Sequence, residues 1–266
     1  MKRDNKGRFI RKYSLNENFL NQINEKNSFF VGLMAADGNV ANKKTFSLSQ
    51  SGENGFHLIT TIRDWLEFNG KINETPTNRQ QSYSIIITSE KMVDDLSKHN
   101  IVKNKTKTYN FNDNVLLKEF LQGYIEGDGC VGIYDSSTTL YYYISFFGNK
   151  SFIKKILEYI PFEFNSTELN NDYLEVRFLG ENGLKFSEWL WEKPVYMEST
   201  KYLKFLDFKE NYYPQTKYYK YRVLNNLILE MLENGKQPKQ IANELNINVK
   251  TIYNLKYNKK NGRGTY

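Results

Sequence analysis

The chain of 266 residues contains one cysteine and two histidines, and it has no long apolar run. A single cysteine cannot form a disulfide framework, and so few Cys and His side chains exclude a zinc site built from them. The longest apolar run, Phe29 to Ala36, falls far short of the ~20 residues that span a bilayer. The first residues are basic, but no apolar stretch follows them, so we expect no secretory signal. These absences predict a soluble protein of a reducing compartment, without a membrane partner.

Positive charge is concentrated at the two ends of the chain. The net charge is +7, and residues 1–13 contain six basic residues against one aspartate. Residues 246–266 contain five basic residues and no acid, which leaves a net charge of −3 on residues 14–245. Basic ends are typical of solvated tails, and they are also typical of proteins that bind nucleic acid. If residues 14–245 bind a polyanion, they must do so through a surface on which basic residues are concentrated.

Two apolar helices, each ending in Asp-Gly, divide most of the chain into similar halves. They are expected at 28–38 and 118–129, and their aspartates lie 91 residues apart. We expect Ser28 as the N-cap of the first helix and Gly38 as a left-handed residue after it. Residues 15–27, before the first helix, also have helix-like spacing.

Strands and amphipathic helices follow each Asp-Gly step in the same order. In the first half, strands are predicted at 45–50, 70–73 and 82–88, with helices at 55–68 and 90–99. In the second half, strands are predicted at 131–134, 140–147, 163–169 and 173–178, with helices at 150–159 and 185–191. Both halves read α-β-β-α-β-β-α, which indicates an internal repeat.

The last part of the chain has a different pattern. Residues 207–220 are rich in Lys, Tyr and Pro and are expected to be a linker. Helices are then predicted at 224–232, 240–245 and 248–256, and a tight turn joins the last two. This arrangement predicts a helix-turn-helix domain over 221–266, with a small helical packing domain as the alternative. The side chains best placed to meet DNA are Asn248, Lys250, Thr251, Asn254 and Lys256.

The two Asp-Gly steps carry the main chemical signal. An aspartate at a helix C-terminus lies at the negative end of the helix dipole, at a cost of a few tenths to about 1 kcal/mol. A single Asp-Gly would be an ordinary turn, but both helices have small residues at matching positions. These are Gly32, Ala36, Gly123 and Gly127. Close packing of the two helices would bring Asp37 and Asp128 to the same end of their interface.

Two nearby carboxylates raise each other's pKa unless a cation neutralises them. A hard divalent metal with oxygen ligands has this effect. Such a metal also activates water and stabilises the leaving oxygen in phosphoryl transfer. The paired aspartates are therefore candidates for binding a divalent metal.

Residues 30–38 and 121–129 resemble the two motifs of a single-chain LAGLIDADG homing endonuclease. The second segment fits closely, whereas the first departs at Phe30 and at Ala35, where the family has an acid that is not the metal ligand. The resemblance covers about 28–212. It implies an α+β fold in which two pseudo-symmetric αββαββα repeats, 28–112 and 113–206, form a DNA-binding saddle. A basic segment, 1–27, would precede them.

The resemblance also implies a set of site residues. Asp37 and Asp128 would be catalytic and would bind Mg2+ or Mn2+, together with the backbone carbonyls of Ala36 and Gly127. Gln50, at the end of a strand, would orient water. Gly148-Asn149 stands at that position in the second half, so we expect the two active sites to be unequal. Lysines that complete the site would be Lys105 and Lys204, which as single residues are otherwise typical of a solvated surface.

Strand alternation adds Ser82, Ser84 and Arg177 as positions that face either DNA or solvent. Together these features predict a monomeric, site-specific double-strand DNA endonuclease with a long asymmetric target, encoded by a mobile element or phage. We expect it in the cytoplasm of a bacterial or phage-infected cell, with an organelle as the alternative. Two other functions remain open at this point. They are a non-cleaving transcription regulator of the same fold, which lacks the catalytic acids, and an RNA intron maturase.

Overall fold

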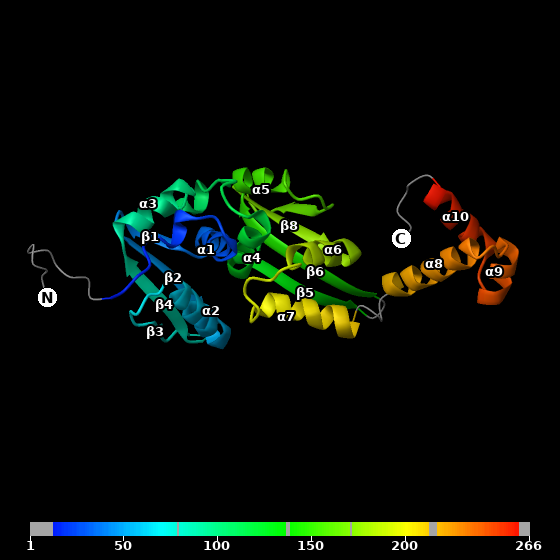
Figure 1. Ribbon diagram of the computed structural model, residues 1–266, viewed down its shortest axis with the longest axis horizontal. Helices are drawn as coiled ribbons and strands as arrows, with labels where there is room; N and C mark the ends of the chain where they lie inside the picture. The colour runs from blue at the N-terminus through cyan, green and yellow to red at the C-terminus, as the bar shows by residue number, and fades with distance from the viewer. Residues whose placement is uncertain (1–12, 79, 137–138, 171, 213–216, 261–266) are drawn as a thin grey trace, which may run out of the picture. The chain divides into compact units, whose positions relative to one another are not determined.

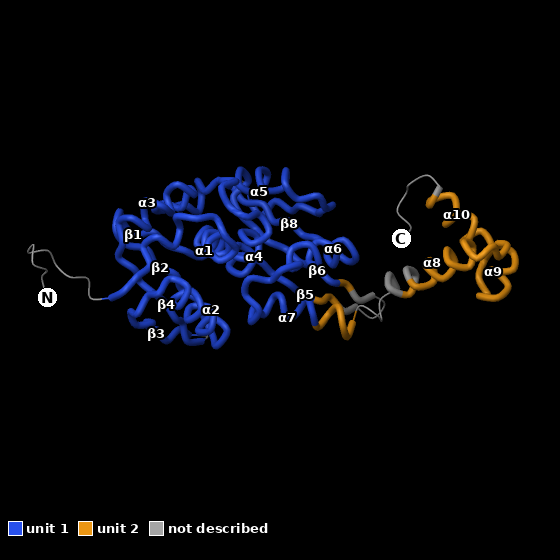
Figure 2. Tube along the Cα trace, in the orientation of Figure 1, with its two compact units in different colours: residues 1–132, 142–206 blue, residues 133–141, 207–266 orange. Residues whose placement is uncertain are grey.

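The computed structural model describes residues 13–78, 80–136, 139–170, 172–212 and 217–260 (Figure 1). The chain forms two compact units (Figure 2), one of residues 1–132 and 142–206 and one of residues 133–141 and 207–266. The basic residues between 1 and 12, and Arg263, lie outside the described residues. Within the described part, no helix is both long and apolar enough to cross a bilayer.

Both repeats have the predicted α-β-β-α-β-β-α order, and the second repeat ends in a further helix, α7, that was not predicted. The first half contains α1 (Glu25–Ala36), β1 (Asn39–Asn42), β2 (Thr45–Ser51), α2 (Gly52–Trp65), β3 (Asn73–Thr75), β4 (Ser82–Thr88) and α3 (Glu90–Lys98). The second contains α4 (Leu117–Asp128), β5 (Gly129–Ser136), β6 (Thr139–Asn149), α5 (Lys150–Leu157), β7 (Asn165–Glu168), β8 (Tyr173–Leu179), α6 (Gly180–Leu190) and α7 (Thr200–Asp207).

The two sheets have the same topology. The strand order is β1-β2-β4-β3 in the first sheet and β5-β6-β8-β7 in the second. In each sheet one face is buried, and α2 and α6 pack against the first and second sheet respectively. The buried face consists of alternate apolar residues, namely Phe46, Leu48, Ile85 and Ile87 in one sheet and Ile144, Phe146, Val176 and Phe178 in the other. The residues between them point to the opposite face, because side chains alternate along a strand.

The start of the first repeat differs from the sequence expectation. Before α1, residues 15–24 contain a short 3-10 turn, Phe19–Asn21, in place of the expected longer helix. Helix α1 begins at Glu25, and its N-cap is Asn24, whose side chain accepts from the backbone N–H of Asn27. Ser28 is therefore inside the helix, where its hydroxyl accepts from the backbone N–H of Leu116, at 2.9 Å, just before α4.

Gly38 and strand β1 are two further differences. Gly38 does not have a left-handed backbone. A Cβ there would lie 2.6 Å from the carbonyl oxygen of Met34, so the close approach of the backbone, not the turn conformation, requires glycine. Strand β1 was missed because it has four residues and buries only Val40, too short a pattern for alternation to reveal.

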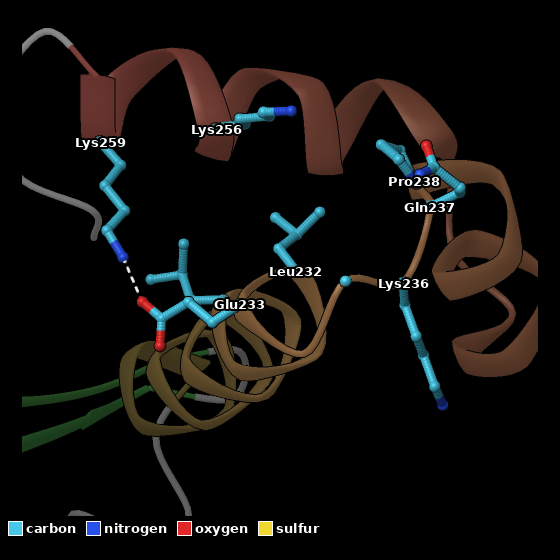
Figure 3. Close-up of a pocket in the computed structure, with 9 residues that line it drawn as sticks. Leu232, Glu233, Lys236, Gln237, Pro238, Lys256 and Lys259 are labelled. Atoms are coloured by element: carbon cyan, nitrogen blue, oxygen red, sulfur yellow. Dashed lines mark hydrogen bonds and ion pairs between the residues drawn. The ribbon is translucent and has the colours of Figure 1, made fainter.

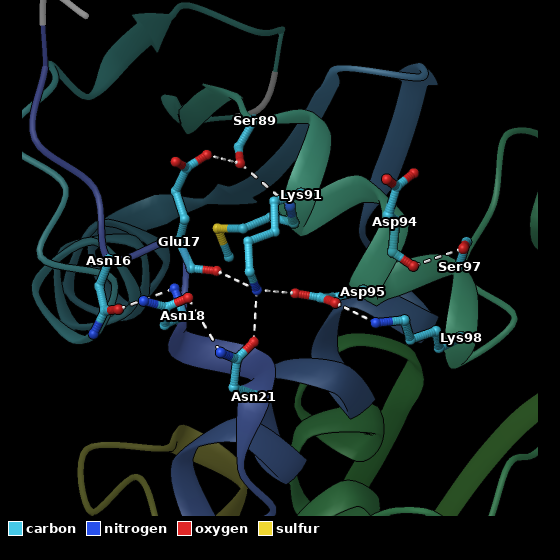
Figure 4. A network of polar contacts seen from close by, with 11 residues as sticks. Asn16, Glu17, Asn18, Asn21, Ser89, Lys91, Asp94, Asp95, Ser97 and Lys98 are labelled. Carbon is cyan, nitrogen blue, oxygen red and sulfur yellow. Dashed lines mark hydrogen bonds and ion pairs between the residues drawn. The ribbon is translucent and has the colours of Figure 1, made fainter.

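A polar network fixes the segment before α1 against helix α3 (Figure 4). The ammonium of Lys91 donates to the carbonyl oxygen of Glu17 at 3.0 Å and to Asp95 at 2.7 Å. Lys98 also donates to Asp95 at 2.7 Å. Burial raises the pKa of Asp95, but the two lysines outweigh this and hold it below its usual value. The network positions α3, and the loop that follows α3 carries Lys105.

The second unit contains three helices with a core of their own. They are α8 (Lys217–Glu233), α9 (Pro238–Leu245) and α10 (Val249–Lys260). The core is formed by Ile228, Met231, Ile241, Ala242, Ile252 and Leu255. Asn246 adopts a left-handed conformation in the short turn between α9 and α10. Helix α8 begins inside the segment expected as a linker, which also includes the π-helix Phe208–Tyr212.

A pocket of about 300 Å³ lies among these helices (Figure 3). Lys256 and Lys259 of α10 line it, and Lys259 donates to Glu233 of α8 at 2.6 Å. This ion pair joins the last helix of the unit to the first.

Candidate active site

Helices α1 and α4 meet through two reciprocal glycine contacts. A Cβ on Gly32 would lie 1.9 Å from the carbonyl oxygen of Phe120, and a Cβ on Gly123 would lie 1.9 Å from the carbonyl oxygen of Phe29. No other residue fits at either position without moving a backbone. The close helix packing predicted from the small residues is therefore present in the structure.

The contact continues to the two Asp-Gly steps. A Cβ on Gly127 would lie 2.5 Å from the Cβ of Ala36 and 2.8 Å from Oδ2 of Asp37. The carboxylate of Asp37 thus lies against the residue that precedes Asp128. Asp37 is exposed, whereas Asp128 is partly buried. Burial and, to a smaller extent, the charge of Asp37 raise the pKa of Asp128 to about 6.

Two lysine ammonium groups approach the same helix ends. Lys105 is only 6% exposed, and its Nζ donates to the carbonyl oxygen of Ala36 at 3.2 Å. Lys201 of α7 donates to the carbonyl oxygens of Glu126, at 2.5 Å, and Gly127, at 3.3 Å. Each half of the first unit therefore places one lysine beside the carbonyl that precedes its aspartate.

Lys204 does not lie at this site. It is exposed on α7, and Lys201, three residues earlier, occupies the place that the family resemblance gave to Lys204. The helix period explains the difference, because Lys201 shares a face with Phe205, four residues later, which is 3% exposed. The spacing to buried aromatic residues was the signal that could have separated the two lysines.

The protonation of the two lysines depends on the carboxylates around them. Burial lowers the pKa of Lys105, while Asp128 and Asp37 oppose this effect. Burial also lowers the pKa of Lys201, and here the strongest opposing group is Glu126. Glu126 was not selected from the sequence. Its carboxylate accepts a hydrogen bond from the hydroxyl of Ser199, and burial raises its pKa.

The two strand ends beside the aspartates are not equivalent. Gln50, at the end of β2, donates from Nε2 to Oδ2 of Asp37 at 2.6 Å. In the second half a Cβ on Gly148 would lie 2.8 Å from both Phe152 and the hydroxyl of Tyr124, so no longer side chain fits there. Asn149 caps α5 and donates to the carbonyl oxygen of Tyr109. Gln50 therefore has no counterpart near Asp128 among the residues that the structure describes.

A small cavity takes that place in the second half. It has a volume of about 40 Å³, and Asp128, Lys105, Tyr124 and Gly148 are among its lining residues. A volume of this size admits a water molecule where polar partners are present. The hydroxyl of Tyr124 itself donates to the carbonyl oxygen of Phe147 at 2.9 Å.

The donor set at the helix ends fits a hard divalent cation. Two carboxylates and two backbone carbonyls supply only oxygen atoms, which Mg2+ and Mn2+ prefer. No cluster of three or more His, Cys, Asp or Glu side chains occurs in the part of the chain that the structure describes. A cation bound here would therefore depend on the backbone oxygens as well as on Asp37 and Asp128, and it would offset their mutual repulsion.

The remaining candidate residues lie on other surfaces of the two units. Ser82 and Ser84 are half-buried on β4, and Arg177 is exposed on β8. In the second unit the candidate side chains are all exposed, namely Asn248, Lys250, Thr251, Asn254 and Lys256. Asn248 also accepts from the backbone N–H of Lys250 at 2.9 Å, at the start of α10.

No family model matches the chain, and no curated protein matches it. Among solved structures, it is similar to the LAGLIDADG meganuclease I-AabMI bound to uncleaved DNA, with a TM-score of 0.50 and 15% identity over 70% of this chain and 89% of that chain. The chain has the LAGLIDADG fold. Matches also include I-SmaMI bound to cleaved DNA (TM-score 0.46, 13% identity, 91% and 99% coverage). A further match is I-GzeII in complex with its DNA target (TM-score 0.45, 13% identity, 80% and 92% coverage).

Proposed function

We propose that this chain is a site-specific DNA endonuclease that hydrolyses both strands of a duplex with the help of a divalent metal. The observation that carries the proposal is the meeting of Asp37, Asp128, Lys105 and Lys201 at one end of the α1–α4 interface. The LAGLIDADG fold supports it, since I-AabMI, which shares this fold, is a meganuclease bound to DNA.

The carboxylates of Asp37 and Asp128 and the carbonyl oxygens of Ala36 and Gly127 would hold Mg2+ or Mn2+. When bound, the metal supplies an activated water and stabilises the oxygen that leaves the phosphate. The chain would support this chemistry through Lys105 and Lys201, whose ammonium groups lie beside these carbonyls and would stabilise negative charge on a phosphate bound there. Gln50 fixes the carboxylate of Asp37 and has a side-chain carbonyl that can accept from a water.

The electrostatics favour cleavage over mere binding. Burial raises the pKa of Asp128 and lowers the pKa of Lys105 and Lys201, so the fold places all three groups where their charged forms are disfavoured. Perturbed groups gathered in this way are typical of catalytic sites. This clustering supports a catalytic role for the site in addition to DNA binding.

Further parts of the proposal concern the DNA itself. The exposed sheet faces, including Ser82, Ser84 and Arg177, would contact a long asymmetric target, and a monomer would suffice because one chain carries both halves. Helices α9 and α10 would add a second DNA contact in the manner of a helix-turn-helix, through the exposed start of α10. We further propose that the chain is encoded by a mobile element or phage and acts in the cytoplasm of the host cell.

A plasmid assay tests the function. Purified protein is incubated with a plasmid that carries the DNA flanking its gene, without the gene, in the presence and absence of Mg2+. We expect a linear product with one defined end, only when Mg2+ is present. Absence of any cut with Mg2+ or Mn2+, together with specific binding to the same DNA, would instead support the non-cleaving regulator.

A further inference from the structure

The exposed faces of the two sheets have different chemistry. On the first sheet, Ser49 of β2 faces Ser84 of β4, and Ser51 faces Ser82. These side chains are short and uncharged. On the second sheet, β8 carries an exposed Arg177 and a half-buried Glu175 on the face opposite to Val176 and Phe178, which are fully buried. Of the two central strand pairs, β2–β4 and β6–β8, the second therefore presents long charged side chains and the first presents serines.

The charged side chains of β8 are held in place by their neighbours. The Nη2 of Arg177 donates to Oε1 of Glu175 at 2.8 Å. Its guanidinium lies 5.1 Å from the ring centroid of Tyr143 on β6. The hydroxyl of Tyr143 is 3.7 Å from Sγ of Cys130, and its ring occupies the space where Gly132 would carry a Cβ. The guanidinium is therefore preorganised between a ring and a carboxylate.

This arrangement still leaves hydrogen-bonding capacity toward solvent. The side chain of Arg177 is 44% exposed, and a guanidinium has five N–H donors in a fixed fork. Glu175 has a second carboxylate oxygen, which accepts. The pair thus offers exposed donors and a partly exposed acceptor side by side on one strand. The negative charge of Glu175 would repel a phosphate group. A base pair, in contrast, can accept hydrogen bonds from Arg177 and donate one to Glu175.

A G·C pair has the complementary pattern in the major groove. Guanine presents the N7 and O6 acceptors that suit an arginine fork, and cytosine presents an N4 amino donor that suits a carboxylate. We propose that Arg177 and Glu175, held by Tyr143, read a G·C base pair in the major groove of the target. This inference rests on the proposed function and names one position of the sequence that the enzyme requires.

The position of that base pair follows from the sheet. Cys130 is two residues beyond Asp128, and it contacts Tyr143 under the guanidinium. Strands β5 and β8 are separated by β6 alone, and two strand spacings amount to about 10 Å. The two residues from Asp128 to Cys130 add about 7 Å along the strand. At about 3.4 Å of helix axis per base pair, the combined distance of about 17 Å places the G·C pair within about five base pairs of the bond nearest Asp128.

A selection from randomised duplexes tests the inference with the full chain. Duplexes bound in Ca2+ and duplexes cut in Mg2+ are sequenced for the wild type and for Arg177→Gln, Glu175→Ala and Arg63→Gln. Arg63 is the matched control, because it forms a similar pair with Asp64, at 3.0 Å, on helix α2. Thermal unfolding of each variant shows whether it folds as the wild type does, which matters most for the half-buried Glu175 and Arg63.

We expect the wild type to require G·C at one position near the cut. Arg177→Gln should weaken the preference for guanine at that position by about 10- to 100-fold and leave the other positions unchanged. Glu175→Ala should weaken the base preference at the same position by a smaller factor, and Arg63→Gln should change no preference.

Wild-type preferences that persist in Arg177→Gln would overturn the inference but not the proposed function. A uniform gain in affinity for all sequences by Glu175→Ala would overturn the role of Glu175. If the wild type enriches no sequence, both proposals fail.

Discussion

The first repeat leaves Asp37 exposed and gives its carboxylate a direct hydrogen bond from Gln50, whereas the second repeat partly buries Asp128 beside a small cavity. Tyr124 and Phe152 fill the place in the second half that would be needed for a side chain at Gly148. The acids differ too, since Ala35 in the first repeat corresponds to Glu126 in the second. Two halves with the same strand order thus surround their aspartates differently.

The comparison separates what the backbone fixes from what it leaves free. The reciprocal contacts of Gly32 and Gly123 allow almost no change, because each glycine touches a carbonyl oxygen of the other helix. They impose the shared end at which both aspartates meet. Side chains at the strand ends do not take part in that contact, so they can diverge between the halves. The α1–α4 interface is therefore nearly symmetric, whereas the side chains around the two aspartates differ between the halves.

Loss of either aspartate should have the largest effect. Asp37→Asn and Asp128→Asn each remove a metal ligand with little change of shape, so double-strand cleavage should fall by about 1000-fold or more, given several kcal/mol of metal stabilisation. DNA binding should remain close to that of the wild type. Plasmid linearisation and gel-shift titration measure the two quantities, and full cleavage by either variant would contradict a site shared between the halves.

Lys201→Met and Lys204→Met compare two lysines on the same helix. We expect Lys201→Met to slow cleavage by about 100-fold, as for loss of one group that stabilises transition-state charge. Lys204→Met should stay within about two-fold of the wild type, because an exposed lysine contributes little. Single-turnover rates at saturating enzyme provide the test. Equal losses in the two variants would show that the contact of Lys201 with the α4 carbonyls has no catalytic role.

Much of this architecture follows from sequence pattern. The two apolar helices and their small residues predicted the α1–α4 contact, since glycine spacing reports directly on how closely two helices pack. The choice between Lys201 and Lys204 depended on which face of α7 is buried, and only tertiary packing around Phe205 decides that. Likewise, no local signal shows that Tyr124 fills the space beside Gly148. The first residues of α1 and α8 were not predicted correctly, because the start of a helix depends on contacts with neighbouring segments as well as on its own sequence.

Removal of helices α8 to α10 should weaken DNA binding without removing the chemistry. A chain ending before Lys217 lacks α8 to α10 and their lysines, so we expect about 10-fold weaker binding and a flatter salt dependence. Every lysine or arginine that no longer neutralises a phosphate lowers the slope of log K against log salt by about 0.9. Binding titrations over a range of salt concentrations measure this slope. An unchanged slope and footprint would show that the unit is a helical packing domain.

The raised pKa of Asp128 predicts a pH-dependent response to metal. Its folded pKa, about 6, is above the ordinary value of 3.8, so the stability it contributes is present below about pH 4 and is lost as pH rises through about 6. Bound Mg2+ should offset this loss. We expect added Mg2+ to raise the melting temperature by a few degrees at about pH 8, and we expect this gain to disappear toward about pH 5, where Asp128 is protonated. Thermal unfolding of the wild type and of Asp128→Asn, with and without Mg2+, measures it; the variant should show little gain at either pH.

The unequal surroundings of the two aspartates are tested most directly by following each strand of a labelled target during cleavage. We expect the wild type to cut one strand before the other, so that a nicked duplex with a defined strand broken accumulates first. Gln50→Ala removes the hydrogen bond to Asp37, which is one of the differences between the halves. It should slow the faster strand by about 10-fold, so that the two rates approach each other. Equal rates for both strands of the wild type, with no nicked species at limiting enzyme, would contradict the account.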